Sequence, residues 1–283
     1  MRSPVSSASA LAVVFLLLVS SQSRSAETPR DQAWAILQAN WNENNTEKRV
    51  QAVRVLALLP RDLRALALAK KAASDETAEV RTAAATALGQ LHGKSSIELL
   101  HKLLGDKEPS VALAAASALI PSKDPLAYEA YYEFLTGFRK TGNGLIADQM
   151  KTLRDPKKMA EIGIEDGIGF VPYAGIGLSA FKTLRADDVS PVRAAAAKLL
   201  GSDPDPISGR ALVIATTDKS WLVKAAALEA IAKRDDPKLL DGIVPAMIDD
   251  NTSVRCTAAA AVIRLSTITE ASRKKPLRLP TFR

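Results

Sequence analysis

A pattern that recurs about every 31 residues constrains the fold of this chain more than any other feature. Each copy has an anchoring valine, an Asp or Asn five residues before it, and a bulky aliphatic residue eight residues after it. The anchors are Val50, Val80, Val111, Val192, Val223 and Val254. Positions 0, 3, 4, 7 and 8 from an anchor lie on one face of a helix. Each copy therefore predicts an amphipathic helix, and the recurrence predicts a repeat architecture.

The middle of this predicted buried face is mostly alanine, as at Ala84 and Ala227, so that neighbouring helices can approach closely. A second apolar segment precedes the helix in each unit, for example residues 97–104 and 237–244. A unit is then a pair of antiparallel helices, and such pairs bury their apolar faces by stacking. The chain has 48 Ala against 3 Trp, 4 Tyr and 6 Phe, which favours helix over strand. We predict an all-α fold, an α-solenoid of about seven stacked antiparallel helix pairs over residues 27–271.

Several units resemble a known repeat. The stretches that carry the resemblance are residues 75–89, 187–197 and 249–255, each with an Asp, then Val-Arg, and in the first two a run of alanines. They resemble the short HEAT-like repeat of the phycobilisome-lyase type, over roughly residues 34–265. The first unit departs from the pattern at Asn45 and Gln51, and the third has Ala112 where Arg is usual. The resemblance implies the fold; its members include scaffolds, adaptors and a few chromophore lyases.

The recurrent Asp and Arg residues have a structural interpretation. An Asp in the turn between two helices can accept backbone N–H groups that begin the next helix. An Arg directly after the anchor can pair with the Asp of its own or an adjoining unit. We interpret these residues as a ladder that holds the repeats in register, in preference to an anion or metal site. The predicted ladder consists of Asp75, Arg81, Asp106, Asp187, Arg193, Asp218, Asp249 and Arg255.

An enlarged, irregular middle repeat interrupts the array at about residues 121–185. Its predicted helices run over 125–138 and from 145 toward 160, and the next unit begins near 172. The stretch is rich in glycine and aromatic residues. Aromatic residues are enriched at binding hot spots. We expect a partner-binding surface here; the alternative is that the rings fill a wedge where the solenoid bends. The candidate binding residues are Tyr128, Tyr131, Tyr132, Phe138, Phe170 and Tyr173.

Both ends of the chain differ from the repeats. Residues 1–26 predict a cleaved signal peptide, with a basic start, an apolar run over 10–19 and small residues before the cleavage site. The apolar run is shorter than the roughly 20 residues that span a bilayer. The protein is therefore expected to be secreted or periplasmic, and nucleic acid is not an expected partner. Residues 272–283 predict a flexible basic tail.

Catalytic and metal-binding patterns are weak. Cys256 is the one cysteine, and it stands on a repeat helix where other units often carry alanine. His92 and His101 have no acidic residues at metal-ligand spacing. We expect no catalytic residue, metal or cofactor. The predicted function is an exported, non-enzymatic scaffold or adaptor that binds a protein partner on its repeat surface. Two alternatives stay open: an enzyme or lyase-like subunit related to the bilin lyases, and an envelope protein in peripheral contact with a membrane.

Overall fold

The computed structural model describes residues 27–136 and 190–274, and in these two ranges the chain is helical and has no strand. The first range contains α1 (Pro29–Trp41), α2 (Thr46–Arg54), η1 (Val55–Leu58), α3 (Leu63–Ala72), α4 (Ala78–Leu91), α5 (Lys94–Leu104), α6 (Pro109–Leu119), η2 (Ile120–Ser122) and α7 (Pro125–Thr136). The second contains α11 (Ser190–Leu200), α12 (Pro206–Ala215), α13 (Trp221–Arg234), η4 (Pro237–Leu239), α14 (Leu240–Ile243), η5 (Val244–Ile248) and α15 (Thr252–Lys274).

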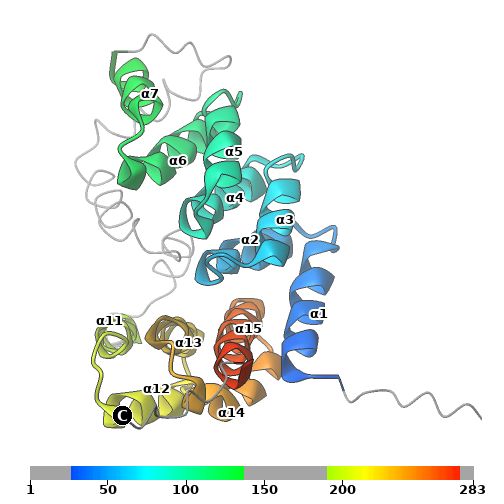
Figure 1. Cartoon of the computed structure of the whole chain (residues 1–283), viewed down its shortest axis with the longest axis vertical. Helices are drawn as coiled ribbons and strands as arrows, with labels where there is room; N and C mark the ends of the chain where they lie inside the picture. The colour runs from blue at the N-terminus through cyan, green and yellow to red at the C-terminus, as the bar shows by residue number, and fades with distance from the viewer. Residues whose placement is uncertain (1–26, 137–189, 275–283) are drawn as a thin grey trace, which may run out of the picture.

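The predicted α-solenoid is confirmed. Five helix pairs are complete in the described ranges: α1 with α2, α3 with α4, α5 with α6, α12 with α13, and the η4–α14–η5 segment with α15. Helix α7 packs on the α5–α6 pair, and α11 packs on the α12–α13 pair. The second helices of the pairs form an inner layer, and α3, α5, α12 and α14 lie outside it (Figure 1). Helix α15 extends to Lys274.

Small residues set the distance between neighbouring inner helices. A Cβ added at Gly89 on α4 would lie 2.8 Å from the Cβ of Ala118 on α6. Gly201, at the equivalent position after α11, would place its Cβ 3.0 Å from the Cβ of Ala230 on α13. Real Cβ atoms do not come as close as 2.8 Å, and at 3.0 Å the neighbour has to shift, so the glycines permit the approach of the two helices. The alanines predicted to be buried, Ala84 and Ala227, are fully buried.

The spatial order of the units differs from their order in the sequence. α7 packs on α6 and α5, whereas α11 packs on α13 and α12, and the two helices lie at opposite ends of the array (Figure 1). The two halves meet in the middle, where α15 packs against α13 on one side and against α1 and η1 on the other. We expected the irregular repeat to lie between consecutive units. Instead, the described units on either side of it are the two ends of the array.

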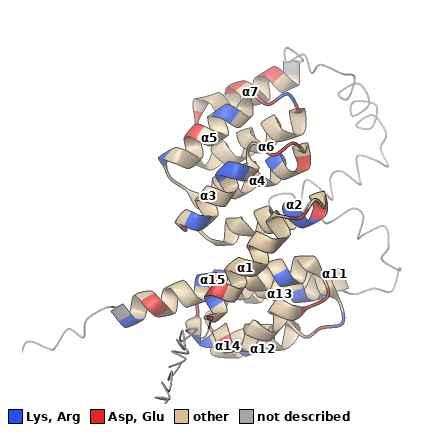
Figure 2. Ribbon diagram, turned by 90° about the vertical axis from the view of Figure 1, so that its right-hand side faces the viewer, with Lys and Arg blue, Asp and Glu red and all other residues tan. Residues whose placement is uncertain are grey.

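Helix α15 is therefore an interior element, although it is the last helix described. Over most of its length its side chains are buried on all sides, among them Val254, Cys256, Val262, Ile263 and Leu265. Its C-terminal part extends past the helices beside it (Figure 2). Burial raises the pKa of the Cys256 thiol to about 12, so this cysteine is a small core residue, as expected. A helix that is apolar all round is typical of the inside of a protein.

Candidate functional site

Helix α7 presents an apolar stripe that is not covered by the described part of the chain. Tyr128, Tyr132 and Leu135 have spacings of four and three residues, so they share one face. They are 53%, 66% and 86% exposed. Ala127 and Ala130 lie on the other side of the helix and are buried. α7 is therefore apolar on both faces, and only one of them is used in packing against the array.

The structure divides the predicted binding residues into three groups. Tyr128 and Tyr132 lie on the exposed face of α7, as expected. Tyr131 does not, because it is half-buried at the border of the packed face and contacts the core. Phe138, Phe170 and Tyr173 lie outside the described residues, as do the predicted helices over 145–160 and from 172. Sequence reasoning missed Leu135, which its spacing of seven from Tyr128 could have revealed.

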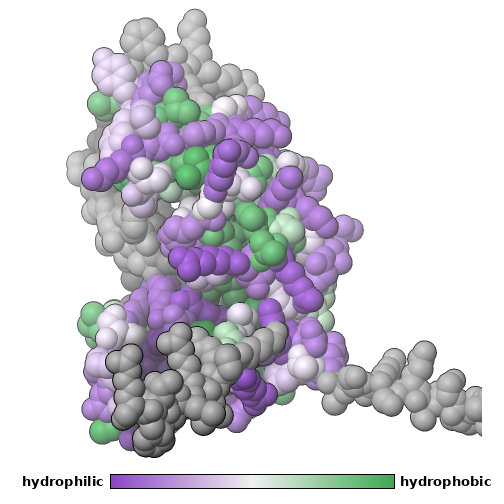
Figure 3. Space-filling model, in the orientation of Figure 1, coloured by the Kyte–Doolittle hydropathy of each residue, from purple (hydrophilic) through white to green (hydrophobic). Residues whose placement is uncertain are grey.

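The opposite end of the array is also apolar. The exposed aliphatic residues here lie on α11 and α12 and are Val192, Leu199, Ile207 and Ile214. Figure 3 shows hydrophobic surface at the lower left edge, over these two helices. Terminal repeats of a solenoid usually carry a polar outer face, because they have no neighbour to cover them. Both ends of the described array instead expose apolar side chains, so they differ from the polar end repeats of a typical solenoid.

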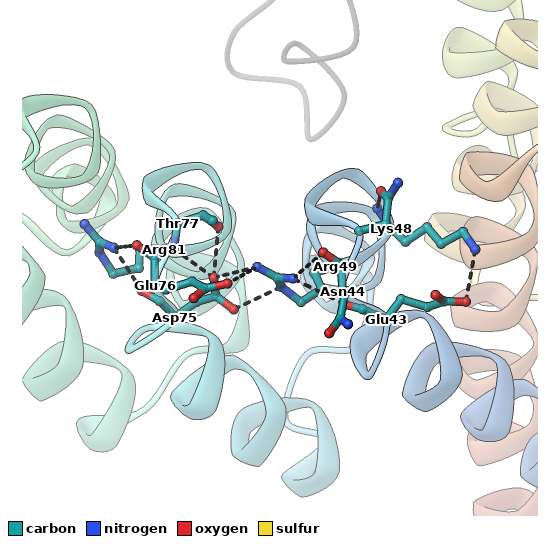
Figure 4. A network of polar contacts seen from close by, with 9 residues as sticks. Glu43, Asn44, Lys48, Arg49, Asp75, Glu76, Thr77 and Arg81 are labelled. Carbon is teal, nitrogen blue, oxygen red and sulfur yellow. Dashed lines mark hydrogen bonds and ion pairs between the residues drawn. The ribbon is translucent and has the colours of Figure 1, made fainter.

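The Arg–Asp pairs cross from one unit to the next. Arg81 donates from Nε and Nη2 to the two carboxylate oxygens of Asp106, at 2.8 and 3.0 Å, and from Nη1 to the carbonyl oxygens of Asp75 and Glu76. One guanidinium therefore links its own turn to the next turn, and Figure 4 shows its contacts with the turn of Asp75 and Glu76. Each turn Asp also accepts the backbone N–H two residues on. The other inter-unit pairs are Arg49 with Asp75, Arg193 with Asp218, and Lys224 with Asp249.

Arg49 was not predicted to be part of the ladder. It precedes the anchor Val50, whereas the pattern places Arg after the anchor. Its guanidinium nevertheless reaches Asp75 at 3.2 Å and the carbonyl oxygens of Glu43 and Asn44, as Arg81 does one unit later (Figure 4). Arg255 donates to the carbonyl oxygens of Asp249 and Asp250. Asp187 lies outside the described residues. The pairs hold neighbouring turns at a fixed spacing, which agrees with a structural interpretation.

The electrostatics of Asp106 and Asp75 have the same cause. Burial alone would raise the pKa of Asp106, but the hydrogen bonds from Arg81 and from the N–H of Glu108, together with the Arg81 charge, outweigh it and lower the pKa. The pKa of Asp75 is likewise lowered, since the Thr77 N–H, the Thr77 hydroxyl and Arg49 overcome the effect of burial. The charged forms of these carboxylates are therefore the forms that the fold favours.

We expect Asp106→Asn to destabilise the protein by about 1–3 kcal/mol at neutral pH, because it leaves the Arg81 guanidinium without its carboxylate. Since the pKa of Asp106 is lower in the folded state than the unfolded value of about 3.9, its contribution is present above that pH and is lost as the pH falls through the folded pKa. Urea unfolding at several pH values measures this. The exposed Asp241→Asn is the matched control. If the loss of unfolding free energy in Asp106→Asn stayed constant from pH 7 to about pH 3, the stabilising role of the Asp106 carboxylate would be contradicted.

Other polar groups form no reactive constellation in the described ranges. His101 contacts the carboxylate of Asp124 at 2.7 Å, which links α5 to the start of α7. No three His, Cys, Asp or Glu side chains of residues 27–136 and 190–274 are placed to hold a metal ion. None of the helices described in these ranges combines the length and the apolarity needed to cross a membrane.

The fold and its surfaces define a helical-repeat protein. A family model described as HEAT repeats matches residues 35–130 and 179–264, which is more than half of the chain. The chain therefore belongs to the HEAT-repeat family, and the resemblance seen in the sequence is confirmed. HEAT repeats suggest a protein-interaction scaffold.

Similar solved structures are distant. Human deoxyhypusine hydroxylase in complex with glycerol is 17% identical, with a TM-score of 0.31 over 84% of this chain and 97% of that one. The complex of CpcE and CpcF of phycocyanin lyase from Nostoc sp. PCC7120 is 20% identical, with a TM-score of 0.32 over 86% and 94%. A designed armadillo repeat protein is 16% identical, with a TM-score of 0.26 over 82% and 98%. None of the curated proteins compared with the chain matches it. Likenesses this weak are no evidence for a shared activity.

Proposed function

We propose that this protein is an exported, non-enzymatic scaffold that binds a protein partner through the exposed stripe of α7. The observation that carries the proposal is the stripe itself, formed by Tyr128, Tyr132 and Leu135. Aromatic side chains provide large contact areas at low conformational cost and are enriched at binding hot spots. They are exposed at the end of the described array of HEAT repeats.

The packed face of α7 explains why the stripe can be tested without unfolding the protein. Ala127 and Ala130 hold the helix against the array, while Tyr128 and Tyr132 point away from it. Substitution of the two tyrosines therefore removes contact area for a partner and leaves the buried contacts of Ala127 and Ala130 in place. Surface substitutions of this kind usually change stability by no more than about 0.5 kcal/mol.

The test is a comparison of captured partners. The chain with Tyr128→Ser and Tyr132→Ser is expected to lose a protein that the unchanged chain retains from an envelope extract, identified by mass spectrometry. The matched control is Ile207→Ser with Ile214→Ser, which alters an exposed stripe at the other end of the array. Thermal melts of all three chains show whether the fold is kept. Equal capture by the tyrosine variant and the unchanged chain would exclude α7 as the binding surface.

Export is a separate part of the proposal, and it rests on the amino-acid pattern of residues 1–26. The mature chain is then expected to start between residues 22 and 27. Sequencing of the N-terminus of the native protein decides this. A chain that begins at Met1 in a cytoplasmic fraction would overturn the proposal of export while leaving the scaffold function open.

A further inference from the structure

A second surface feature lies where the two halves of the array meet. A cleft of about 940 Å³ opens between the N-terminus of α1, the loop over residues 59–62 with the start of α3, and the C-terminal part of α15. We call it the junction cleft. Its volume is within the range of about 300–1,000 Å³ that is common for ligand-binding pockets. The α7 stripe is on a different part of the array, so the junction cleft is independent of the function proposed above.

Acidic side chains of the junction cleft already have partners. Glu270 accepts a hydrogen bond of 2.7 Å from Arg30 Nη1, and Asp235 is held by Arg264 at 2.5 and 2.9 Å. Asp62 accepts the N–H groups of Arg64 and Ala65 at the start of α3. Asp31 accepts a hydrogen bond of 2.7 Å from the Thr28 hydroxyl. Each of these carboxylates accepts a hydrogen bond within the protein, and the Thr28 hydrogen bond together with the charges of Arg64 and Arg30 lowers the pKa of Asp31.

Basic groups of the junction cleft remain available. Arg61 is exposed and makes no hydrogen bond or ion pair with the described residues. Arg64 lies over the ring of Trp34, 5.8 Å from its centroid, and its guanidinium makes no hydrogen bond to a carboxylate of the described ranges, although its charge acts on Asp31. The Nε of Arg30 is buried and has no acceptor among the described residues. Arg61 and Arg64 thus keep donors for a further carboxylate, although the cleft contains Arg and acidic residues in equal number.

Apolar groups lie beside these arginines. Leu63 stands between Arg61 and Arg64 and is 80% exposed, and Pro60 and Ile268 also line the cleft. A guanidinium group binds a carboxylate through two parallel hydrogen bonds. The cleft therefore combines two groups that recognise carboxylates with an apolar contact between them, in a space much larger than a single inorganic anion needs.

We propose that the junction cleft binds an acidic peptide segment, with Arg61 and Arg64 holding its carboxylates and Leu63 contacting an apolar side chain between them. The peptide is held across the contact between the two halves of the array, because the cleft is lined by both. Its binding weakens as salt is raised, since Arg61 and Arg64 are exposed and their charges are screened.

The experiment measures fluorescence anisotropy of a short fluorescein-labelled peptide in which glutamate and leucine alternate, added to the whole chain at low salt. A peptide with glutamine in place of glutamate is the neutral probe. The unchanged chain is expected to bind the acidic peptide and not the neutral one. Arg61→Gln with Arg64→Gln is expected to weaken binding about tenfold or more. Arg210→Gln, which alters an exposed arginine of α12, is expected to bind like the unchanged chain.

Several outcomes overturn the proposal. The first is the absence of binding by the unchanged chain. The second is equal binding of the acidic and the neutral peptide, and the third is binding by the double variant as tight as that of the unchanged chain. Displacement of the peptide by inorganic phosphate as readily as by unlabelled peptide would show a simple anion site and exclude the peptide assignment. Arg61→Gln alone guards against a folding defect, because the Arg61 side chain has no partner in the described ranges. Substitutions on α7 leave this binding unchanged, so the two proposals fail separately.

Discussion

A chain that ends after Asn251 and so lacks α15 is expected to lose its cooperative fold in both halves of the array. In a solenoid stacked in sequence order, the last helix is an end cap, and its removal exposes one face of one unit. Here α15 packs on α13, α1 and η1, so its removal exposes both halves. Val254, Val262, Ile263 and Leu265 are fully buried, and each is worth about 1.5–3 kcal/mol. Their loss alone rivals the total stability of a typical domain, about 5–15 kcal/mol.

Circular dichroism and urea unfolding measure this prediction. A chain that ends after Lys274 is the matched control, because it keeps the whole of α15. We expect the control to melt like the full chain, and the shorter chain to show reduced helicity without a single sharp transition. If the chain ending at Asn251 kept a cooperative transition within a few degrees of the control, α15 would be a peripheral helix and its position in the array would be wrong.

Glutamate at Ala84 or Ala227 is expected to cost more than about 3 kcal/mol of stability. Both alanines are fully buried in inner helices, Ala84 on α4 between α2 and α6, and Ala227 on α13 between α11 and α15. Neither site has room for a longer side chain, since inner helices approach as closely as Gly89 and Ala118 do. The carboxylate would also lose its water without gaining a cationic partner.

Thermal melts and urea titrations of the three single variants test this expectation, with Thr86→Glu as the third. Thr86 is two residues from Ala84 on the same helix, and its side chain is exposed. Thr86→Glu therefore adds the same charge without the burial, and glutamate is the better helix former at this position. A melting temperature for Ala84→Glu equal to that of Thr86→Glu would show that Ala84 faces solvent and that the predicted buried face of the repeat is wrong.

The repeat could be predicted from the sequence because its signals are local. The anchors at 30–31 residues, the alanines between them and the turn aspartates each act within one unit or between neighbours. The exception, Arg49, shows the limit of a fixed spacing. A side chain as long as arginine reaches the same carboxylate from either side of the anchor, so the pair is kept while the pattern in the sequence shifts by two positions.

The order of the units in space could not be predicted in the same way. Every unit has a similar alanine-rich face. When a long segment separates two groups of repeats, the local sequence therefore does not determine which units of the two groups pack together. One signal was present. Residues 258–263 of α15 are a continuous apolar run, which indicates a helix covered on all sides and not the exposed end of an array. The exposed face of α7 was predicted in part, because Tyr128 and Tyr132 are spaced by one helical turn.

The central position of α15 has a consequence for the topology of the chain. Arg30 Nη1 near the start of α1 lies 2.7 Å from Glu270 Oε2 near the end of α15, so the first and last described helices are neighbours. A circular permutant that joined them, and opened between α7 and α11, would pass through the same helices in plain spatial order, residues 190–274 before 27–136. A proteolytic cut between α7 and α11 would likewise leave two fragments that remain associated through α1 and α15. The segment that connects the two halves along the chain and the contact that holds them together are thus at different places in the molecule.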